Sequence, residues 1–190
     1  MQEKLEGTLE FLREAERLKT AMRSGWTSAG RQESVAEHTW RLCLMAMVLY
    51  DHAEGIDLTK LLKMCLIHDL GEALSGDIPA PAQQDAPGKA DRERADLLQV
   101  IAPLPGAVRE DIVALWDEYE TASSAEARVA KGLDKLETIL QHTQGSNPPD
   151  FDYGFNLTYG RRYTAADPLL AALRARLDLE TARRAKDVAP

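Results

Sequence analysis

Residues 58–78 have the sequence LTKLLKMCLIHDLGEALSGDI, and this stretch decides how the rest of the chain is interpreted. Its apolar residues recur at spacings of three and four, as on the buried face of a helix. That face begins with leucines and Cys65 but ends with His68 and Glu72. Ionisable side chains on a buried face are unfavourable unless something compensates their charge. We therefore predict that His68, Glu72 and the adjoining Asp69 line a site that holds a cation.

The preceding segment has the same feature. Ser34, followed three residues later by Glu37, predicts a capping box at the start of a helix, and His38 then lies on its apolar face. A lone histidine on such a face is more often a hydrogen-bonded core residue than a ligand. The connection around Gly55 is short, however, so the two helices are expected to be antiparallel neighbours with His38 and His68 at the same end. Imidazole and carboxylate together favour Zn, Mn, Fe or Co, with Mg as a further option.

A later helix, expected from Ser123 to about His142, supplies Asp134. Ser123 and Glu126 have the spacing of a second capping box. From spacing alone, Asp134 is either a third contributor to the cation site or a surface carboxylate paired with a neighbouring lysine. Glu137, one turn further on, is interpreted as a solvated charge.

The remaining sequence predicts further helices, separated at glycine and proline, and no convincing alternating strand. The first helix is expected from Glu3 to Arg23. Others are expected at 89–101, after Pro105, and after the pair Asp167-Pro168. We expect one all-α domain, a compact helical bundle over residues 1–182, followed by a flexible tail at 183–190. Apolar faces at 108–119 and 170–177 fit either the core or a homodimer interface.

Composition argues against several functions. The chain has 23 basic and 31 acidic residues, a formal net charge of −8, and no basic cluster of the kind that binds nucleic acid polymers. No segment approaches the ~18 consecutive apolar residues of a membrane span. The N-terminus is acidic and amphipathic, unlike a signal peptide. Cys43 and Cys65 lie in apolar segments without a CxxC pair, so we expect reduced thiols and a cytoplasmic location.

Three strings together resemble the HD-domain superfamily: SVAEH at 34–38, HDLGEALSGDIPAP at 68–81 and KGLDKLE at 131–137. With GWTSAGRQE at 25–33 they are similar to the HD-domain 5′-deoxynucleotidases. The resemblance implies an all-helical, commonly dimeric enzyme that uses a divalent metal to hydrolyse deoxyribonucleoside 5′-monophosphates to nucleoside and phosphate. It implies four metal ligands, His38, His68, Asp69 and Asp134.

The resemblance also implies roles around the metal. Glu72 would hold or deprotonate the nucleophile, or bind a second metal near Asp77. Arg23 would hold the phosphate oxygens, since a planar guanidinium suits them. Trp26, Asp77 and Ile78 would contact the substrate on its sugar side. Without the resemblance, Arg23 could equally be a solvated helix-end cation, Asp77 a turn cap and Trp26 a hydrophobic lid.

Two other functions stay open at this point. A different HD-type hydrolase would act on a cyclic nucleotide, a nucleoside triphosphate or an alarmone. A non-catalytic helical module would use the metal only to stabilise its fold, and Glu72 would then be dispensable.

Overall fold

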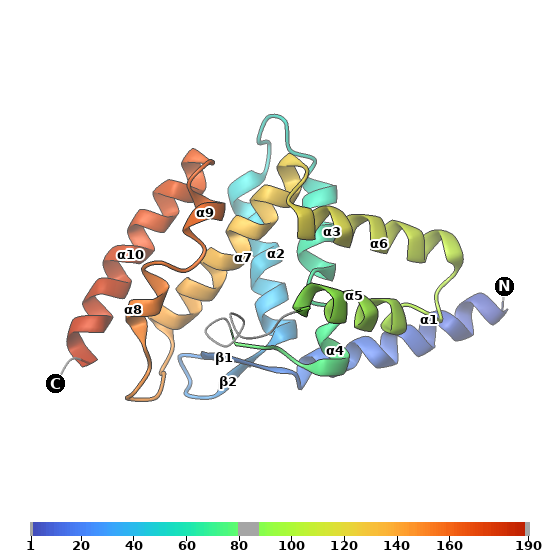
Figure 1. Ribbon diagram of the computed structural model, residues 1–190, viewed down its shortest axis with the longest axis horizontal. Coiled ribbons are helices and arrows are strands. Elements are labelled where there is room, and N and C mark those ends of the chain that lie inside the picture. Colours follow the sequence, from blue (N-terminus) through green and yellow to red (C-terminus); the bar gives the residue numbers. More distant parts are fainter. Residues whose placement is uncertain (1, 80–87, 189–190) are drawn as a thin grey trace.

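Helix α7, Ala125–Gln144, is the central element of the computed structural model, which describes residues 2–79 and 88–188 (Figure 1). α2, Val35–Tyr50, and α3, Leu58–Ile67, pack against α7, and so does α10, Pro168–Val188. Two short helices, α8 at Tyr153–Asn156 and α9 at Arg161–Thr164, lie between α7 and α10. Because α7 is covered by these neighbours, nearly all of its residues from Glu126 to Thr143 are buried.

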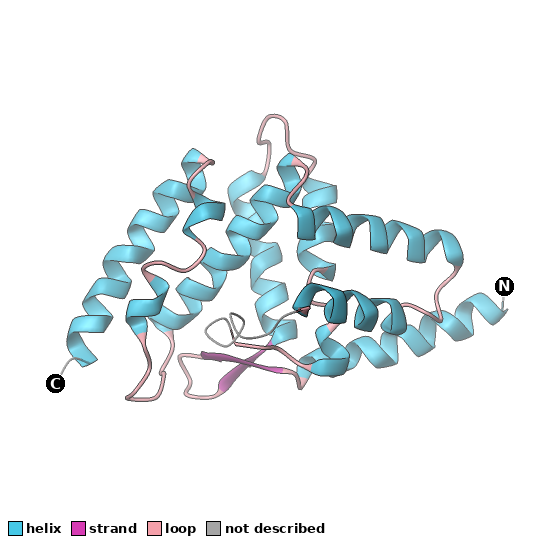
Figure 2. Ribbon diagram, in the orientation of Figure 1, coloured by secondary structure: helices cyan, strands magenta, loops and turns pink. Residues whose placement is uncertain are grey.

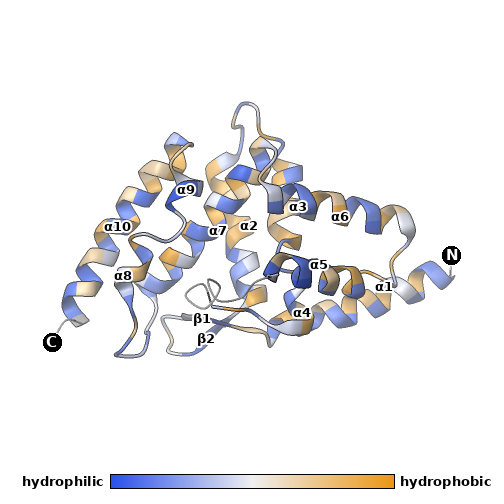
Figure 3. Cartoon of the chain, viewed as in Figure 1, coloured by the Kyte–Doolittle hydropathy of each residue, from blue (hydrophilic) through white to orange (hydrophobic). Residues whose placement is uncertain are grey.

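The remaining helices complete an all-α bundle, as the sequence predicts. They are α1 at Gln2–Ala15, the 3₁₀ helix η1 at Glu16–Lys19, α4 at Glu72–Ser75, α5 at Lys89–Val100 and α6 at Gly106–Thr121. α2 and α3 carry many apolar residues (Figure 3). No helix in the described part of the chain is long and apolar enough to cross a membrane.

A small β-hairpin was not predicted. β1, Met22–Trp26, pairs antiparallel with β2, Gln32–Ser34, and the pairing contains an irregularity between its two ends (Figure 2). The prediction of a helix up to Arg23 is therefore wrong: regular α-helix ends at Ala15. The residues after Lys19 include Thr20, Ser24 and Gly25, which are poor helix formers, and pairing with β2 gives their backbone groups the partners that a helix would have supplied.

Of the two predicted capping boxes, the one at Ser34 is confirmed, and the one at Ser123 is not formed. Ser34 Oγ accepts the Glu37 backbone N–H at 3.3 Å, and the Glu37 carboxylate accepts the Ser34 N–H at 2.9 Å, so the capping box opens α2. At α7 the cap is Ser124, not Ser123. Glu126 does not close a box there, because its carboxylate accepts the backbone N–H of Asp57 and pairs with Lys60.

The helix that carries His68 is shorter than predicted. α3 ends at Ile67, and the next residues form tight turns in which the Glu72 N–H bonds to the Asp69 carbonyl three residues back. Gly71 packs directly on α5: a Cβ there would lie 2.6 Å from the Glu93 carbonyl oxygen. Glu72 therefore begins α4 and does not share a continuous helix with His68, although it remains buried beside it.

The two apolar faces left open by the sequence contribute to the core of the monomer. Tyr119 of α6 is buried, and so are Leu170 and Leu177 of α10, but Val108 at the start of α6 is 40% exposed. The domain limit expected at 182 falls inside α10, which continues to Val188, and Arg184 donates a hydrogen bond to the Gly145 carbonyl. Residues 189–190 of the expected tail lie outside the described residues.

Candidate metal centre and pocket

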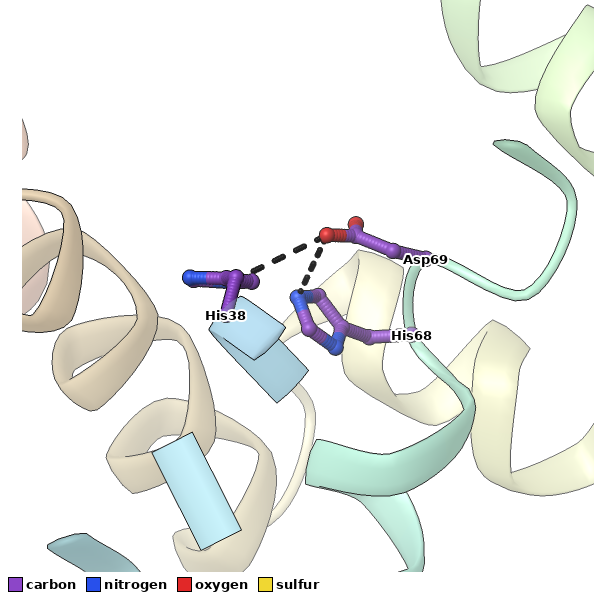
Figure 4. Close-up of side chains that lie close together, drawn as sticks. All are labelled: His38, His68 and Asp69. Carbon is purple, nitrogen blue, oxygen red and sulfur yellow. Dashed lines mark ion pairs between the residues drawn. The ribbon is translucent and has the colours of Figure 1, made fainter. Parts of the chain in front are cut away.

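His38, His68 and Asp69 meet where α2 and α3 run side by side (Figure 4). Their potential ligand atoms all lie within 4.8 Å of one another. The Asp69 carboxylate oxygen Oδ2 is 3.1 Å from His68 Nε2 and 3.8 Å from His38 Nε2. The two imidazole rings are 5.6 Å apart between centroids. The prediction that the histidines share one end of the helix pair is confirmed.

Asp134 approaches the same point from α7. Its Oδ1 lies 3.3 Å from His38 Nε2 and 4.0 Å from His68 Nε2. Its Oδ2 accepts a hydrogen bond from the Tyr119 hydroxyl at 3.0 Å and pairs with Lys135 at 2.7 Å. The interpretation of Asp134 as a surface carboxylate is wrong, because the residue is buried, although one of its oxygens does pair with a lysine as that interpretation expected. The other oxygen faces the imidazoles, as a contributor to the cation site would. Burial acts against ionisation, but Lys135 and the two histidines hold the pKa of Asp134 well below its usual range.

The outer nitrogen of each imidazole is already engaged. His68 Nδ1 donates to the Cys65 carbonyl at 2.8 Å, and His38 Nδ1 bonds to the Glu137 carboxylate. Both Nε2 atoms are buried and, among the described residues, have no hydrogen-bond partner. Two unpartnered imidazole nitrogens that face two carboxylates are a donor set that fits a divalent cation.

Glu137 is the clearest correction to the sequence analysis. It is not a solvated charge, because its side chain is 0% exposed. Its carboxylate bonds to His38 on one side and accepts from Arg41 Nε at 2.6 Å on the other. The sequence signal was present: Glu137 follows Asp134 by three residues and so shares its face of α7.

Arg23 reaches this centre from β1. Its NH1 lies 3.3 Å from Asp69 Oδ2, and its NH2 donates to Thr138 Oγ1 at 3.2 Å. Burial acts to lower the pKa of Arg23, but the carboxylates around it, chiefly Asp69 and Asp77, raise it above its ordinary value. Arg23 is thus a permanent cation beside the candidate metal ligands and is not a solvated residue at a helix end.

Glu72 and Asp77 bring two further carboxyl groups to the same pocket. Burial, followed by repulsion from Asp69 and Asp77, raises the pKa of Glu72 to about 10. Burial also raises the pKa of Asp77, with Arg23 opposing the shift. Glu72 Oε2 is buried and has no hydrogen-bond partner among the described residues. Crowded carboxyl groups of this kind often mark functional sites.

The pocket over the centre has a volume of about 630 Å³. α4 and α5 lie on one side of α7, and α8 and α9 lie on the other (Figure 1). The described residues that line it include Arg23, His68, Asp69, Glu72, Asp77, Lys89, Glu93, Tyr119, Lys131, Asp134, Lys135, Phe155, Tyr159, Arg162 and Tyr163.

Two predicted substrate contacts are not among the described lining residues: Trp26 and Ile78. The Trp26 backbone is tied to the end of α7, since its carbonyl accepts from the Gln141 side chain at 2.5 Å. The aromatic lining comes partly from 155–163, which the sequence analysis left unassigned. The recurrence of Phe155, Tyr159 and Tyr163 every fourth residue was the available signal.

Comparison with known proteins gives consistent results. A family model described as HD domain matches residues 15–174. The 5′-deoxynucleotidase HDDC2 of Homo sapiens is 38% identical over 138 residues, which cover 72% of this chain and 67% of the human protein. The protein of the same name in Dictyostelium discoideum is 36% identical over 149 residues, covering 74% of this chain and 78% of that one.

A solved structure is similar over nearly the whole length. It is named as a predicted metal-dependent phosphohydrolase from Magnetospirillum magnetotacticum MS-1, and it is 29% identical with a TM-score of 0.82. The match covers 99% of this chain and 100% of that one. The family match, the relatives and the convergence of two histidines with two aspartates agree, and the chain belongs to the HD-domain family.

Proposed function

We propose that this chain is a metal-dependent phosphohydrolase that converts deoxyribonucleoside 5′-monophosphates to nucleoside and inorganic phosphate. The observation that carries the proposal is the pair of unpartnered Nε2 atoms of His38 and His68, which face Asp69 and Asp134 beside the pocket. The relatives named 5′-deoxynucleotidase support the choice of substrate class.

His38, His68, Asp69 and Asp134 are the residues that would hold the cation. When bound, a divalent cation supplies a Lewis acid that lowers the pKa of water and neutralises charge on phosphate. The cation is best supported as a transition metal, because the donor set mixes imidazole and carboxylate. Zn, Mn, Fe and Co fit this donor set, with Mg as a further option, and elemental analysis of the purified protein distinguishes them.

The protein's own groups account for positioning and proton transfer. Arg23 is placed to hold nonbridging phosphate oxygens while water attacks phosphorus in line with the 5′ oxygen. A P–O bond to water forms, the P–O5′ bond breaks, and a proton passes to the departing oxygen. Glu72 is our candidate to hold the attacking water, and to deprotonate it once a bound cation lowers the raised pKa of its carboxyl group, with Asp77 contacting the sugar or orienting that water. A second cation near Glu72 and Asp77 stays a prediction, supported by the unpartnered Glu72 Oε2.

The test is phosphate release from a panel of nucleotides after chelation and metal add-back. We expect release from deoxyribonucleoside 5′-monophosphates of all bases, loss of release on chelation, and recovery with one or more transition metals. Preferential turnover of cyclic nucleotides, nucleoside triphosphates or ppGpp would favour another HD-type hydrolase. Metal binding that raises Tm without turnover of any substrate would favour the non-catalytic module.

An aromatic pair in the pocket supports a nucleoside as the leaving group. Phe155 and Tyr159 are half-buried, and their ring centroids are 5.2 Å apart with an interplanar angle of 30°. Among the other lining tyrosines, Tyr119 is buried, and the Tyr163 ring has the Arg162 guanidinium 4.5 Å from its centre. The Tyr159 ring also has a cation near it, Lys135 Nζ at the longer distance of 5.3 Å, so Phe155 offers the more open face of the pair. We propose that the base stacks on the Phe155–Tyr159 pair, which accepts any base because every base has an aromatic face.

Replacing Tyr159 with alanine is expected to raise KM for dAMP by about 10-fold, since stacking is worth ~1–3 kcal/mol per base. KM for 2-deoxyribose 5-phosphate, which lacks a base, should change little. Steady-state kinetics on both substrates make the comparison, and Tyr159→Phe is the matched control that keeps the ring. Equal losses on the two substrates would show that Tyr159 does not contact the base.

A homodimer is proposed through one face of α2. Trp40, Leu44, Met47 and Val48 recur at helical spacing there, and their exposed fractions run from 38% to 78%. Large apolar side chains grouped on one helix face are typical of contact surfaces. Replacing Met47 and Val48 together with lysine is expected to halve the mass measured by light scattering. An unchanged mass would rule this face out.

We propose a cytoplasmic location because both cysteines are unpaired thiols. Cys43 and Cys65 are both free, and burial raises the pKa of each. Unpaired cysteines are the usual state in reducing compartments.

A further inference from the structure

A closed ring of ionisable side chains passes through two of the candidate metal ligands, Asp69 and His38. These two residues contact each other directly, and a chain of four other residues also connects them. In order around the ring, its members are Asp69, Arg23, Glu33, Arg41, Glu137 and His38. We call this set the ion-pair ring. Three members, Glu33, Arg41 and Glu137, have no role in the mechanism above.

The first half of the ring leaves the metal centre through Arg23. Its NH1 lies 3.3 Å from Asp69 Oδ2, and its Nε lies 3.7 Å from Glu33 Oε2. The other oxygen of Glu33 lies 3.8 Å from Arg41 NH2. Each guanidinium thus lies between two carboxylates, and each carboxylate lies beside two cations or beside a cation and a histidine.

The second half returns through Glu137. Arg41 Nε donates to Glu137 Oε1 at 2.6 Å, and Glu137 Oε2 bonds to His38 Nδ1. Contact between His38 Nε2 and Asp69 Oδ2, at 3.8 Å, closes the ring at the position where a cation would touch both.

The ion-pair ring is largely buried, so losing one of its charges is expected to affect the others strongly. Side-chain exposure is 0% for Glu137, 4% for Glu33 and 19% for Arg41. In such surroundings the loss of one partner leaves an uncompensated buried charge, so these side chains hold one another in a single arrangement. A carboxylate on the outer nitrogen of a ligating histidine fixes its tautomer and orientation and increases its basicity.

We propose that Glu137 and Arg41 are positioning residues for the metal centre: Glu137 keeps the His38 proton on Nδ1 and its Nε2 lone pair toward the cation, and Arg41 keeps Glu137 in place. The proposal rests on the metal centre of the proposed function. It also gives Glu33 a role, which is to hold Arg23 at its Nε while its NH1 faces Asp69.

The experiment is titration of the metal-free full chain with Co²⁺, with a chelator in competition and without substrate. Glu137→Gln keeps the size of the side chain but removes its charge, and we expect it to weaken Co²⁺ binding by about 10–100-fold. Arg41→Lys keeps the charge but loses the pair of nitrogens, Nε and NH2, that both contact Glu137 Oε1, and we expect a smaller loss of Co²⁺ affinity. Folding of each variant is checked by circular dichroism, and Arg41→Lys decides the question if Glu137→Gln does not fold.

Glu126→Gln is the matched control. Glu126 lies on the same helix, is buried, and pairs with Lys60 and the Asp57 backbone, yet it is not part of the ion-pair ring. It should lower Tm without changing the Co²⁺ Kd. A purely structural ring would give the same pattern for Glu137→Gln and Arg41→Lys, and unchanged Kd values would overturn the proposal. Failure of the unaltered chain to bind Co²⁺ would instead overturn the metal centre itself.

Discussion

Replacing His68 with alanine is expected to empty the metal centre and to lower kcat/KM for deoxyribonucleoside monophosphates by roughly 10³-fold or more, because a catalytic metal supplies several kcal/mol of transition-state stabilisation. His68, the residue that caps the C-terminal end of α3, supplies Nε2 as a donor, and its position is fixed by the bond from Nδ1 to the Cys65 carbonyl. Metal content by elemental analysis and phosphate release measure the two effects separately.

His52 is a suitable control for this variant. It is a histidine of the same chain whose side chain is 92% exposed, on a loop away from the pocket lining. His52→Ala should keep both metal and activity. Full metal content and full turnover in His68→Ala would mean that His68 is not a ligand.

Replacing Glu72 with glutamine is expected to lower kcat by about 10²–10⁴-fold, the usual contribution of a general acid or base. The amide keeps the shape of the buried side chain but cannot exchange a proton. Because Glu72 is not one of the four candidate ligands, the variant should retain its metal. Rapid phosphate detection at saturating substrate, together with elemental analysis, tests both parts.

Glu93→Gln provides the comparison for Glu72. Glu93 lines the same pocket but pairs with Lys89 at 2.8 Å, so it is not expected to take part in proton transfer. Its replacement should change kcat only slightly. If Glu72→Gln kept full turnover with metal bound, the proton-transfer role would be wrong.

Most of the fold followed from helical periodicity and capping signals. The Ser34–Glu37 box and the breaks at glycine and proline predicted the starts of α2, α3, α5, α6, α7 and α10 closely. The hairpin could not be predicted, because β1 and β2 are short and their stability comes from pairing with each other and from contacts with α7. The end of α3 was also missed, because it depends on how closely Gly71 packs on α5, which is a tertiary contact.

Some residues of the candidate site could likewise be predicted from the sequence, and others could not. His38, His68 and Asp69 could be assigned because ionisable residues interrupt an apolar periodicity, which is a local pattern. The spacing of Glu137 from Asp134 places both on one face of α7, but the burial of Glu137 could not be predicted, because it depends on Arg41 and His38, which lie about a hundred positions earlier. The aromatic lining at 155–163 lies on the short helices α8 and α9 and the turn between them, and elements of four residues are too short for periodicity to establish a buried face.

The β-hairpin has a consequence for length variation in this part of the chain. Pairing of Met22 with Ser34 and of Trp26 with Gln32 positions Arg23 relative to the start of α2 through the strands, and not through the connecting turn. Insertions at residues 29–30, beyond the hydrogen bond from Ser146 to the Ser28 carbonyl, are expected to lengthen the turn and leave Arg23 in place. One extra residue inside the first turn of α2, by contrast, would rotate His38 by about 100° about the helix axis. Tolerance of insertions and sensitivity to them therefore lie within ten positions of each other.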